Sequence, residues 1–306
     1  MNGATRTTLP TLRGNLCTAE PLARHTTWRV GGPAQRYYEP ADVEDLAAFL
    51  ARTPPEEPLF WLGLGSNLLI RDGGIPGTVV ATGGLLAGLE RVNDYTVRAE
   101  AGVACPKLAR FCGREGLTGA EFMAGIPGTV GGALAMNAGA FGGETWDVVA
   151  AVEVVDRAGQ RHLRRPGSYR VGYREVHRPG EEWFIAGHFL LTAGDASESQ
   201  TRIRGLLRRR GETQPLGVPS CGSVFRNPRG DFAARLIERA GLKGRRIGGA
   251  VVSEKHANFI INAGGATATD IEALMVLVER EVKACCGVDL QREVKVVGLL
   301  PEGVSL

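Results

Sequence analysis

The sequence predicts a mixed α+β fold of two or three subdomains, and three observations lead to that class. Short strands of alternating polarity, bounded by turn residues, recur through the first two thirds, as in GTVVATGG and LERVNDYTVRAEAG. Amphipathic helices interrupt these strands, and in the last third helices and strands alternate. With 306 residues the chain can form more than one hydrophobic core.

Two helices are expected among the strands of the first two thirds. Asp42 is a suitable N-cap for the apolar spacing of residues 43–51. The second helix covers 105–116, where Pro106 fits an early helical position. Residues 1–24 are polar and mixed, and we expect them to form a loosely held arm with one short helix.

A long helix is expected over residues 268–287 in the last third. Thr267 or Thr269, together with Asp270, suits its start, and Gly287 suits its end. A shift in composition at AGDASESQ indicates a linker that precedes this third of the chain.

Composition excludes several classes of protein. Hydrophobic residues make up 43% and charged residues 23% of the chain, which excludes a disordered or fibrous protein. The net charge of +3 indicates neither a nucleic-acid nor a membrane partner. The arginine-rich helix at 201–212 is interpreted as a solvated face, because no aromatic residues are interleaved with its charges.

Neither a secretory signal nor a run of about 18 apolar residues is visible, so we expect a cytoplasmic protein. The six cysteines show no CxxC pair and no spacing with histidine that suits a metal, so inert thiols and no metal site are expected.

Two glycine-rich blocks are candidates for ligand binding. GLGSNLLIRDGG (63–74) matches neither GxGxxG nor GxxxxGK[ST], and by itself it fits an anion-binding loop and a tight hairpin equally well. AGIPGTVGGALAMNAGAFGGE (124–144) has four glycines within 125–132, and GGALAMNAG then resembles a short helix. That arrangement suits a pyrophosphate, and the two blocks together favour a dinucleotide-like ligand.

Polar residues elsewhere are less specific. Ser223 follows a glycine in QPLGVPSCGSVFRNP, but no GxSxG elbow is present, so a turn serine is the simpler interpretation. Arg170 and Arg174 lie beside two tyrosines in SYRVGYRE, and Glu293 precedes an apolar strand. A solvated position is the default for each of these three charged residues.

Taken together, seven segments closely resemble the MurB family of flavoenzymes, the UDP-N-acetylenolpyruvoylglucosamine reductases of peptidoglycan precursor synthesis. They occur in family order between residues 26 and 298: TTWRVGGPA, GLGSNLLIRDGG, AGIPGTVGGALAMNAGA, SYR, QPLGVPSCGSVFRNP, SEKHANFIINAGGATATD and EVKVVG. The short connection between SYR and QPLG is similar to the compact type II form, which lacks an extra loop over the substrate.

The resemblance implies a fold and a cofactor. FAD would be held non-covalently by a domain of the vanillyl-alcohol-oxidase (PCMH) type over 25–195, in two subdomains, 25–84 and 85–195. Residues 200–300 would form a C-terminal α+β substrate-binding domain, with the final strand returning to the FAD domain. The implied FAD-binding residues are Gly63, Leu64, Gly65, Ser66, Asn67, Gly125, Ile126, Pro127, Gly128, Thr129, Gly131 and Gly132.

The resemblance also implies a reaction, the NADPH-dependent reduction of UDP-N-acetylglucosamine enolpyruvate to UDP-N-acetylmuramate by a monomer. Arg170 would bind and polarise the substrate carboxylate with help from Glu293, Ser223 would protonate the enolate, and Asn227 would bind substrate. The sequence YRVGY departs from the family's YR-x-S-x-F, which removes one serine hydrogen bond.

Two rivals remain open. Another PCMH-type FAD oxidase or dehydrogenase would often tether FAD through a histidine or cysteine, and GLGSNLLI contains neither. A non-catalytic nucleotide-binding protein would be colourless and, if it bound nucleic acid through the arginine-rich helix, strongly salt-dependent.

Overall fold

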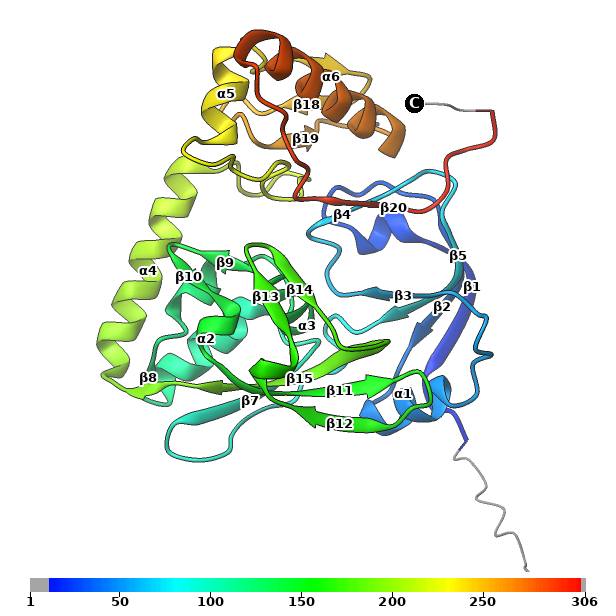
Figure 1. Cartoon of the computed structure of the whole chain (residues 1–306), viewed down its shortest axis with the longest axis vertical. Coiled ribbons are helices and arrows are strands. Elements are labelled where there is room, and N and C mark those ends of the chain that lie inside the picture. The colour runs from blue at the N-terminus through cyan, green and yellow to red at the C-terminus, as the bar shows by residue number, and fades with distance from the viewer. Residues whose placement is uncertain (1–10, 304–306) are drawn as a thin grey trace, which may run out of the picture.

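The N-terminal part of the chain is built on a four-stranded sheet. The computed structural model describes residues 11–303 (Figure 1). The strand order is β1-β2-β5-β3, in which β2, β5 and β3 are parallel and β1 is antiparallel to β2. The bounds are β1 (Asn15–Pro21), η1 (Leu22–His25), β2 (Pro33–Glu39), α1 (Val43–Leu50), β3 (Leu59–Leu62), β4 (Leu68–Ile70) and β5 (Ile75–Ala81).

Helix α1 begins as the sequence predicts. The Asp42 side chain accepts a hydrogen bond from Asp45 N at 2.9 Å, which confirms the cap. Phe49 of α1 stacks on Tyr38 of β2 with ring centroids 3.8 Å apart, so the helix covers the sheet.

The loosely held arm predicted for residues 1–24 is wrong over β1. This strand pairs with β2 from Asn15↔Glu39 to Pro21↔Pro33. Because β1 is an edge strand without a single buried residue, its sequence lacks the apolar alternation that marks a strand. Residues 1–10 of the predicted arm lie outside the described residues.

A five-stranded antiparallel sheet follows, in the order β12-β11-β15-β7-β6. Apolar side chains of helices α2 and α3 and of the long helix α4 pack on it in one buried cluster that includes Leu108, Leu134, Phe189 and Ile203. The bounds are β6 (Leu89–Arg91), β7 (Thr96–Glu100), α2 (Cys105–Arg114), α3 (Val130–Met136), β11 (Val149–Asp156), β12 (Arg161–Arg164), β15 (Glu182–Leu190) and α4 (Ala196–Thr213).

Three short strand pairs and three short 3-10 helices complete this unit. Their bounds are β8 (Leu117–Thr118) with β16 (Thr192–Ala193), β9 (Gly139–Ala140) with β10 (Gly143–Glu144), β13 (Arg170–Gly172) with β14 (Glu175–His177), η2 (Glu121–Gly125), η3 (Thr145–Asp147) and η4 (Pro166–Ser168). The turn of the β13–β14 hairpin contains Arg174.

Helix α4 runs along one side of the molecule and leads to the C-terminal unit (Figure 1). That unit packs two helices on a three-stranded sheet around a second large apolar cluster. Its elements are α5 (Ala233–Arg239), β17 (Arg246–Ile247), β18 (Ala250–Val252), β19 (Ile260–Asn262) and α6 (Ala268–Cys286). Thr267 and Asp270 form a capping box at the start of α6 and Gly287 ends it in the left-handed conformation, which confirms the predicted ends.

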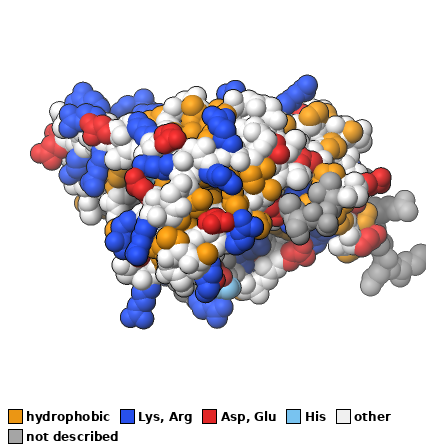
Figure 2. Space-filling model, turned by 90° about the horizontal axis from the view of Figure 1, so that it is seen from above, with side chains coloured by type: hydrophobic (Ala, Val, Ile, Leu, Met, Phe, Trp, Pro, Cys, Tyr) orange, Lys and Arg blue, Asp and Glu red, His pale blue; other side chains and the backbone are white. Residues whose placement is uncertain are grey.

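The last strand leaves the C-terminal unit. Strand β20 (Lys295–Val297) lies parallel to β4, with Lys295 opposite Leu68. On the face seen from above, basic and acidic side chains are interspersed rather than segregated (Figure 2). Across residues 11–303, no helix is both long and apolar enough to span a membrane.

Candidate functional site

Residues 63–67 of the first glycine block form the loop between β3 and β4. Gly65 has φ +58°, and a Cβ there would lie 2.3 Å from the carbonyl oxygen of His25, so a side chain cannot be accommodated. A Cβ on Gly63 would lie 2.6 Å from Oγ1 of Thr129. Leu64 is 41% exposed and projects from the loop.

The second glycine block lies against the first. It runs from the end of η2 through buried Ile126 and exposed Pro127 into α3, and Thr129 Oγ1 accepts the Gly132 N–H at 3.4 Å. A Cβ on Gly128 would lie 3.3 Å from Ser66 Oγ, and one on Gly131 would lie 2.9 Å from Ala101 Cβ. The remaining predicted member, Gly125, closes η2. Two segments that are distant in sequence therefore meet with almost no side-chain bulk between them.

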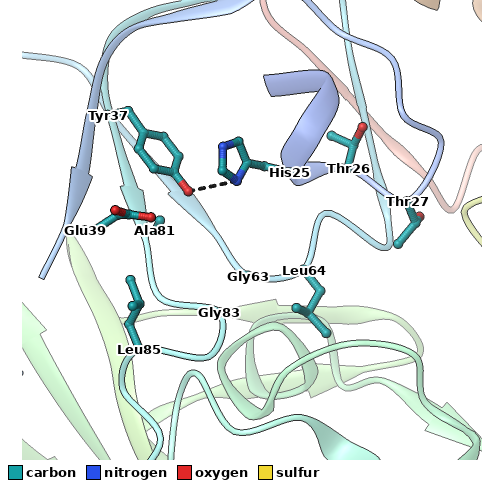
Figure 3. Close-up of a pocket in the computed structure, with 10 residues that line it drawn as sticks. All are labelled: His25, Thr26, Thr27, Tyr37, Glu39, Gly63, Leu64, Ala81, Gly83 and Leu85. Carbon is teal, nitrogen blue, oxygen red and sulfur yellow. Dashed lines mark hydrogen bonds between the residues drawn. The ribbon is translucent and has the colours of Figure 1, made fainter. Parts of the chain in front are cut away.

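A pocket of about 220 Å³ adjoins this junction (Figure 3). Tyr37 and His25 point toward one another, with the hydroxyl 3.1 Å from Nδ1, and His25 Nε2 lies 2.8 Å from Glu20. Burial raises the pKa of the Tyr37 hydroxyl, which therefore keeps its proton.

The rest of the lining combines backbone at Gly63 and Gly83 with the apolar side chains of Leu64 and Leu85. It is completed by Thr26, Thr27, Glu39 and Ala81. Leu85 is 39% exposed, so both leucines offer apolar surface to a ligand. Bare backbone, apolar faces and a polar edge suit a nucleotide, so the residues present fit FAD, the group that the resemblance implies.

The glycine loop is tied directly to Glu293. Asn67, the last residue of the loop, donates from Nδ2 to the Glu293 carbonyl oxygen at 3.2 Å, and its own carbonyl accepts from Lys295 N at 3.1 Å. Glu293 N donates to the carbonyl of Val224, the residue after Ser223, at 2.8 Å. The pairing of β20 with β4 thus brings the predicted loop, glutamate and serine segments together.

Arg174, rather than Arg170, contacts the Glu293 carboxylate. Its Nε lies 3.0 Å from Glu293 Oε1, while Nη1 and Nη2 donate to the carbonyls of Asn137 at 3.3 Å and Gly139 at 2.9 Å. Arg174 occupies the β13–β14 turn with φ +58°, an uncommon conformation for a residue with a side chain. Such strain persists where the surroundings enforce it, and here it directs the guanidinium inward.

Arg170 lies on β13 opposite His177 and is exposed. Within residues 11–303 its side chain makes no hydrogen bond or ion pair, so the placement of Arg170 beside Glu293 needs correction. The sequence contains the reason, because Tyr169-Arg170 and Tyr173-Arg174 repeat the same dipeptide four residues apart. Alignment of the motif on the second copy would have selected Arg174.

Burial raises the pKa of the Glu293 carboxyl above its ordinary value, while the positive charges of Arg174 and Arg226 act in the opposite direction. The Glu293 side chain is 17% exposed. The carboxyl can therefore hold a proton at a higher pH than a solvated glutamate can.

The two remaining predicted residues, Ser223 and Asn227, differ in whether their polar side-chain atoms already have hydrogen-bond partners. Within the described chain the Ser223 hydroxyl has no hydrogen-bond partner, so it is available to a ligand. Asn227 is exposed, and its Oδ1 accepts from Ala233 N at 3.1 Å at the start of α5. The amide NH₂ of Asn227 remains available to a ligand.

A second pocket, of about 470 Å³, lies beside the Arg174 hairpin. Tyr169, Tyr173 and Trp146 line it together with Glu144, which is 3.9 Å from Arg174 Nη1. In the described part of the chain, no three histidine, cysteine or acidic side chains are grouped so that they could hold a metal.

Known proteins match both halves of the chain. Residues 34–163 match the family model described as FAD binding domain, and residues 214–297 match the one described as UDP-N-acetylenolpyruvoylglucosamine reductase, C-terminal domain. The UDP-N-acetylenolpyruvoylglucosamine reductase of Alkalilimnicola ehrlichii is 62% identical over 93% of this chain and 95% of its own length. That of Methylococcus capsulatus is 58% identical over 96% of this chain and 97% of its own.

A solved structure agrees. The crystal structure of UDP-N-acetylenolpyruvylglucosamine reductase (MurB) from Thermus caldophilus superimposes with a TM-score of 0.81 at 35% identity. The superposition covers 95% of this chain and 100% of the Thermus caldophilus chain. With near-complete coverage at more than half identity, and with both domains matched, the chain belongs to the UDP-N-acetylenolpyruvoylglucosamine reductase family, the MurB family.

Proposed function

We propose that this protein reduces the enolpyruvyl ether of UDP-N-acetylglucosamine enolpyruvate with NADPH and forms UDP-N-acetylmuramate. The observation that carries the proposal is the contact between Arg174 and Glu293 beside Ser223, tied through Asn67 to the glycine loop. Membership of the MurB family supports the same substrate class, because the relatives are named for it.

The two glycine blocks and the adjoining pocket would hold FAD without a covalent bond. Residues 63–67 and 125–132 offer close approach to backbone, and Tyr37, His25 and Leu85 offer polar and apolar contacts. When bound, FAD supplies the relay by which a hydride from NADPH reaches the methylene carbon of the substrate. We assign cofactor binding to residues 25–195 and substrate binding to 200–300, with α4 as their connection and β20 returning to β4.

Arg174 and Glu293 would bind the substrate carboxylate. Negative charge develops there as the ether is reduced to an enolate, and a fixed cation in a partly buried site stabilises that charge most effectively. The strained turn and the two carbonyl contacts hold the Arg174 guanidinium in one place. A protonated Glu293 would donate a further hydrogen bond without adding negative charge.

Ser223 would deliver the proton to the enolate carbon. Ser223 directly precedes Val224, whose carbonyl oxygen accepts a hydrogen bond from Glu293 N. A hydroxyl is a weak acid, so its contribution comes from its position next to a strongly basic enolate.

Rapid-mixing experiments on the FAD-loaded protein separate these roles. Ser223→Ala should leave the bleaching of flavin absorbance by NADPH nearly normal and should abolish its recovery with the enolpyruvyl substrate. Equal impairment of both phases would contradict proton delivery by Ser223.

Arg174→Gln and Arg170→Gln form a matched pair for the arginine. We expect Arg174→Gln to slow recovery with substrate by about 100-fold or more, the effect of losing one stabilising donor, and Arg170→Gln to change it less than threefold. The reverse order would restore the carboxylate-binding role to Arg170.

A further inference from the structure

A second arginine, Arg226, lies at the site with most of its side-chain donors unused. It is the third residue after Ser223, and its side chain is partly buried. Its Nε is buried without a hydrogen-bond partner, and its single side-chain hydrogen bond is a long one, from Nη2 to the Arg174 carbonyl at 3.4 Å. Across residues 11–303, no carboxylate lies within ion-pair distance of it.

Hydrogen bonds hold the backbone on both sides of Arg226, so the fold determines where this arginine lies. Arg226 N donates to the Gln291 carbonyl at 2.8 Å, and Phe225 bridges to Arg292. Asn258 holds Phe225 from both sides, accepting its N–H at 2.9 Å and donating to its carbonyl at 2.8 Å.

The contrast with Arg174 shows what is missing. All three nitrogens of Arg174 already bind protein atoms, and two carboxylates, Glu293 and Glu144, lie within 4 Å of its guanidinium. A guanidinium has five N–H donors, and those of Arg226 are nearly all unused. Buried donors are normally paired, so these free donors are available to an acceptor on a ligand, and an oxyanion would form the strongest hydrogen bonds with them.

We propose that Arg226 binds an oxyanion of the sugar-nucleotide substrate through a bidentate contact. This inference rests on the proposed function, since the substrate offers two such groups, the enolpyruvyl carboxylate and the diphosphate. Both present paired oxygens to the planar fork of an arginine. Arg226 would add a second positive charge beside that of Arg174, whose guanidinium already contacts Glu293 and two backbone carbonyls.

The test measures binding to the FAD-loaded protein by isothermal titration calorimetry, with Arg226→Gln, Arg226→Lys and a matched control, Arg229→Gln. Arg229 lies three residues further along and is exposed. The two ligands are UDP-N-acetylglucosamine enolpyruvate and UDP-N-acetylglucosamine, which has the diphosphate but no carboxylate. Flavin absorbance and the melting temperature show whether each variant is folded.

We expect Arg226→Gln to weaken binding of the enolpyruvyl ligand by about 10- to 100-fold, the usual loss for a charge-assisted contact. Arg226→Lys should recover only part of that loss, because an ammonium lacks the fork. An equal loss for both ligands places Arg226 on the diphosphate, and a loss confined to the enolpyruvyl ligand places it on the carboxylate.

Unchanged binding of both ligands in folded Arg226→Gln or Arg226→Lys would overturn the inference, as would a loss equal to that of Arg229→Gln. Failure of the unsubstituted protein to bind the enolpyruvyl ligand would instead refute the proposed function, so the two failures are distinguishable.

Discussion

Arg71→Gln should destabilise the protein far more than Glu272→Gln, although both substitutions break the same ion pair. Arg71 follows β4, and its Nε and Nη2 each lie 2.9 Å from a carboxylate oxygen of Glu272 on α6. The Arg71 side chain is 32% exposed, whereas that of Glu272 is only 4% exposed. The charge that remains after each substitution therefore meets a different environment.

The contacts that remain after each substitution determine how much the free energy of unfolding falls. After Arg71→Gln, buried Glu272 keeps one ionic contact, 3.4 Å from Arg292 Nη1, and an incompletely paired buried charge costs about 3–5 kcal/mol. After Glu272→Gln, water can reach Arg71, and Arg292 retains Glu279 at 2.6 Å. We expect a loss of about 1–2 kcal/mol for that variant. The double variant should be more stable than Arg71→Gln alone.

Urea unfolding of the FAD-loaded protein, followed by circular dichroism, gives the free energies of unfolding. Arg280→Gln is the control on the same helix, because Arg280 is 71% exposed and its loss should change stability by less than about 0.5 kcal/mol. Equal losses for the two single variants, or a larger loss for Glu272→Gln, would refute the reasoning.

Three further substitutions test individual residues. Gly65→Ala should reduce the flavin-to-protein absorbance ratio after gel filtration, because its Cβ would lie 2.3 Å from a carbonyl oxygen; Gly205→Ala, with nothing within 4 Å, should leave the ratio unchanged. Since the pKa of Glu293 is raised and its protonated form assists, turnover should fall as pH rises through that pKa, and Glu293→Gln should flatten this limb; a limb of unchanged shape would exclude the role. Hydrogen bonds from Arg98 and, to a lesser extent, from His188 lower the pKa of Glu153 to about 2. Ionised Glu153 therefore stabilises the fold above the usual glutamate pKa, and this stabilisation is lost as pH falls toward 2. Glu153→Gln should therefore cost about 1–2 kcal/mol near neutral pH, because solvent screens this partly exposed carboxylate, and progressively less in acid; a difference that does not vary with pH would contradict the assignment.

The sequence predicted correctly the features that depend on interactions between neighbouring residues, such as helix ends. The ends of α6 follow from the hydrogen bonds of Thr267 and Asp270 and from the tolerance of Gly287 for positive φ, and the structure confirms all three. The glycine blocks were recognisable because glycine density indicates close backbone approach.

Long-range pairing left no comparable signal. Strand β20 contributes three residues, and nothing in VKVVGLL indicates that it pairs with β4 more than two hundred residues earlier. That pairing brings Glu293 to Asn67, so the geometry of the site could not be derived from local pattern. The apolar residues of SVFRN likewise form no regular strand, only an isolated bridge at Phe225.

A repeated Tyr-Arg dipeptide explains why the sequence pattern indicated Arg170 instead of Arg174. Two Tyr-Arg dipeptides lie four residues apart, and only the turn between β13 and β14 distinguishes an inward-directed guanidinium from an exposed one. Arg226 was visible in the sequence as well, but its unused donors appear only when the partners of each nitrogen are known.

The most direct test of the account is an anaerobic absorbance titration of the FAD-loaded protein. NADPH should bleach the flavin bands, and UDP-N-acetylglucosamine enolpyruvate added next should restore them in stoichiometric amount without oxygen. Bands that stay bleached until oxygen is admitted would contradict the assignment of this substrate to the site.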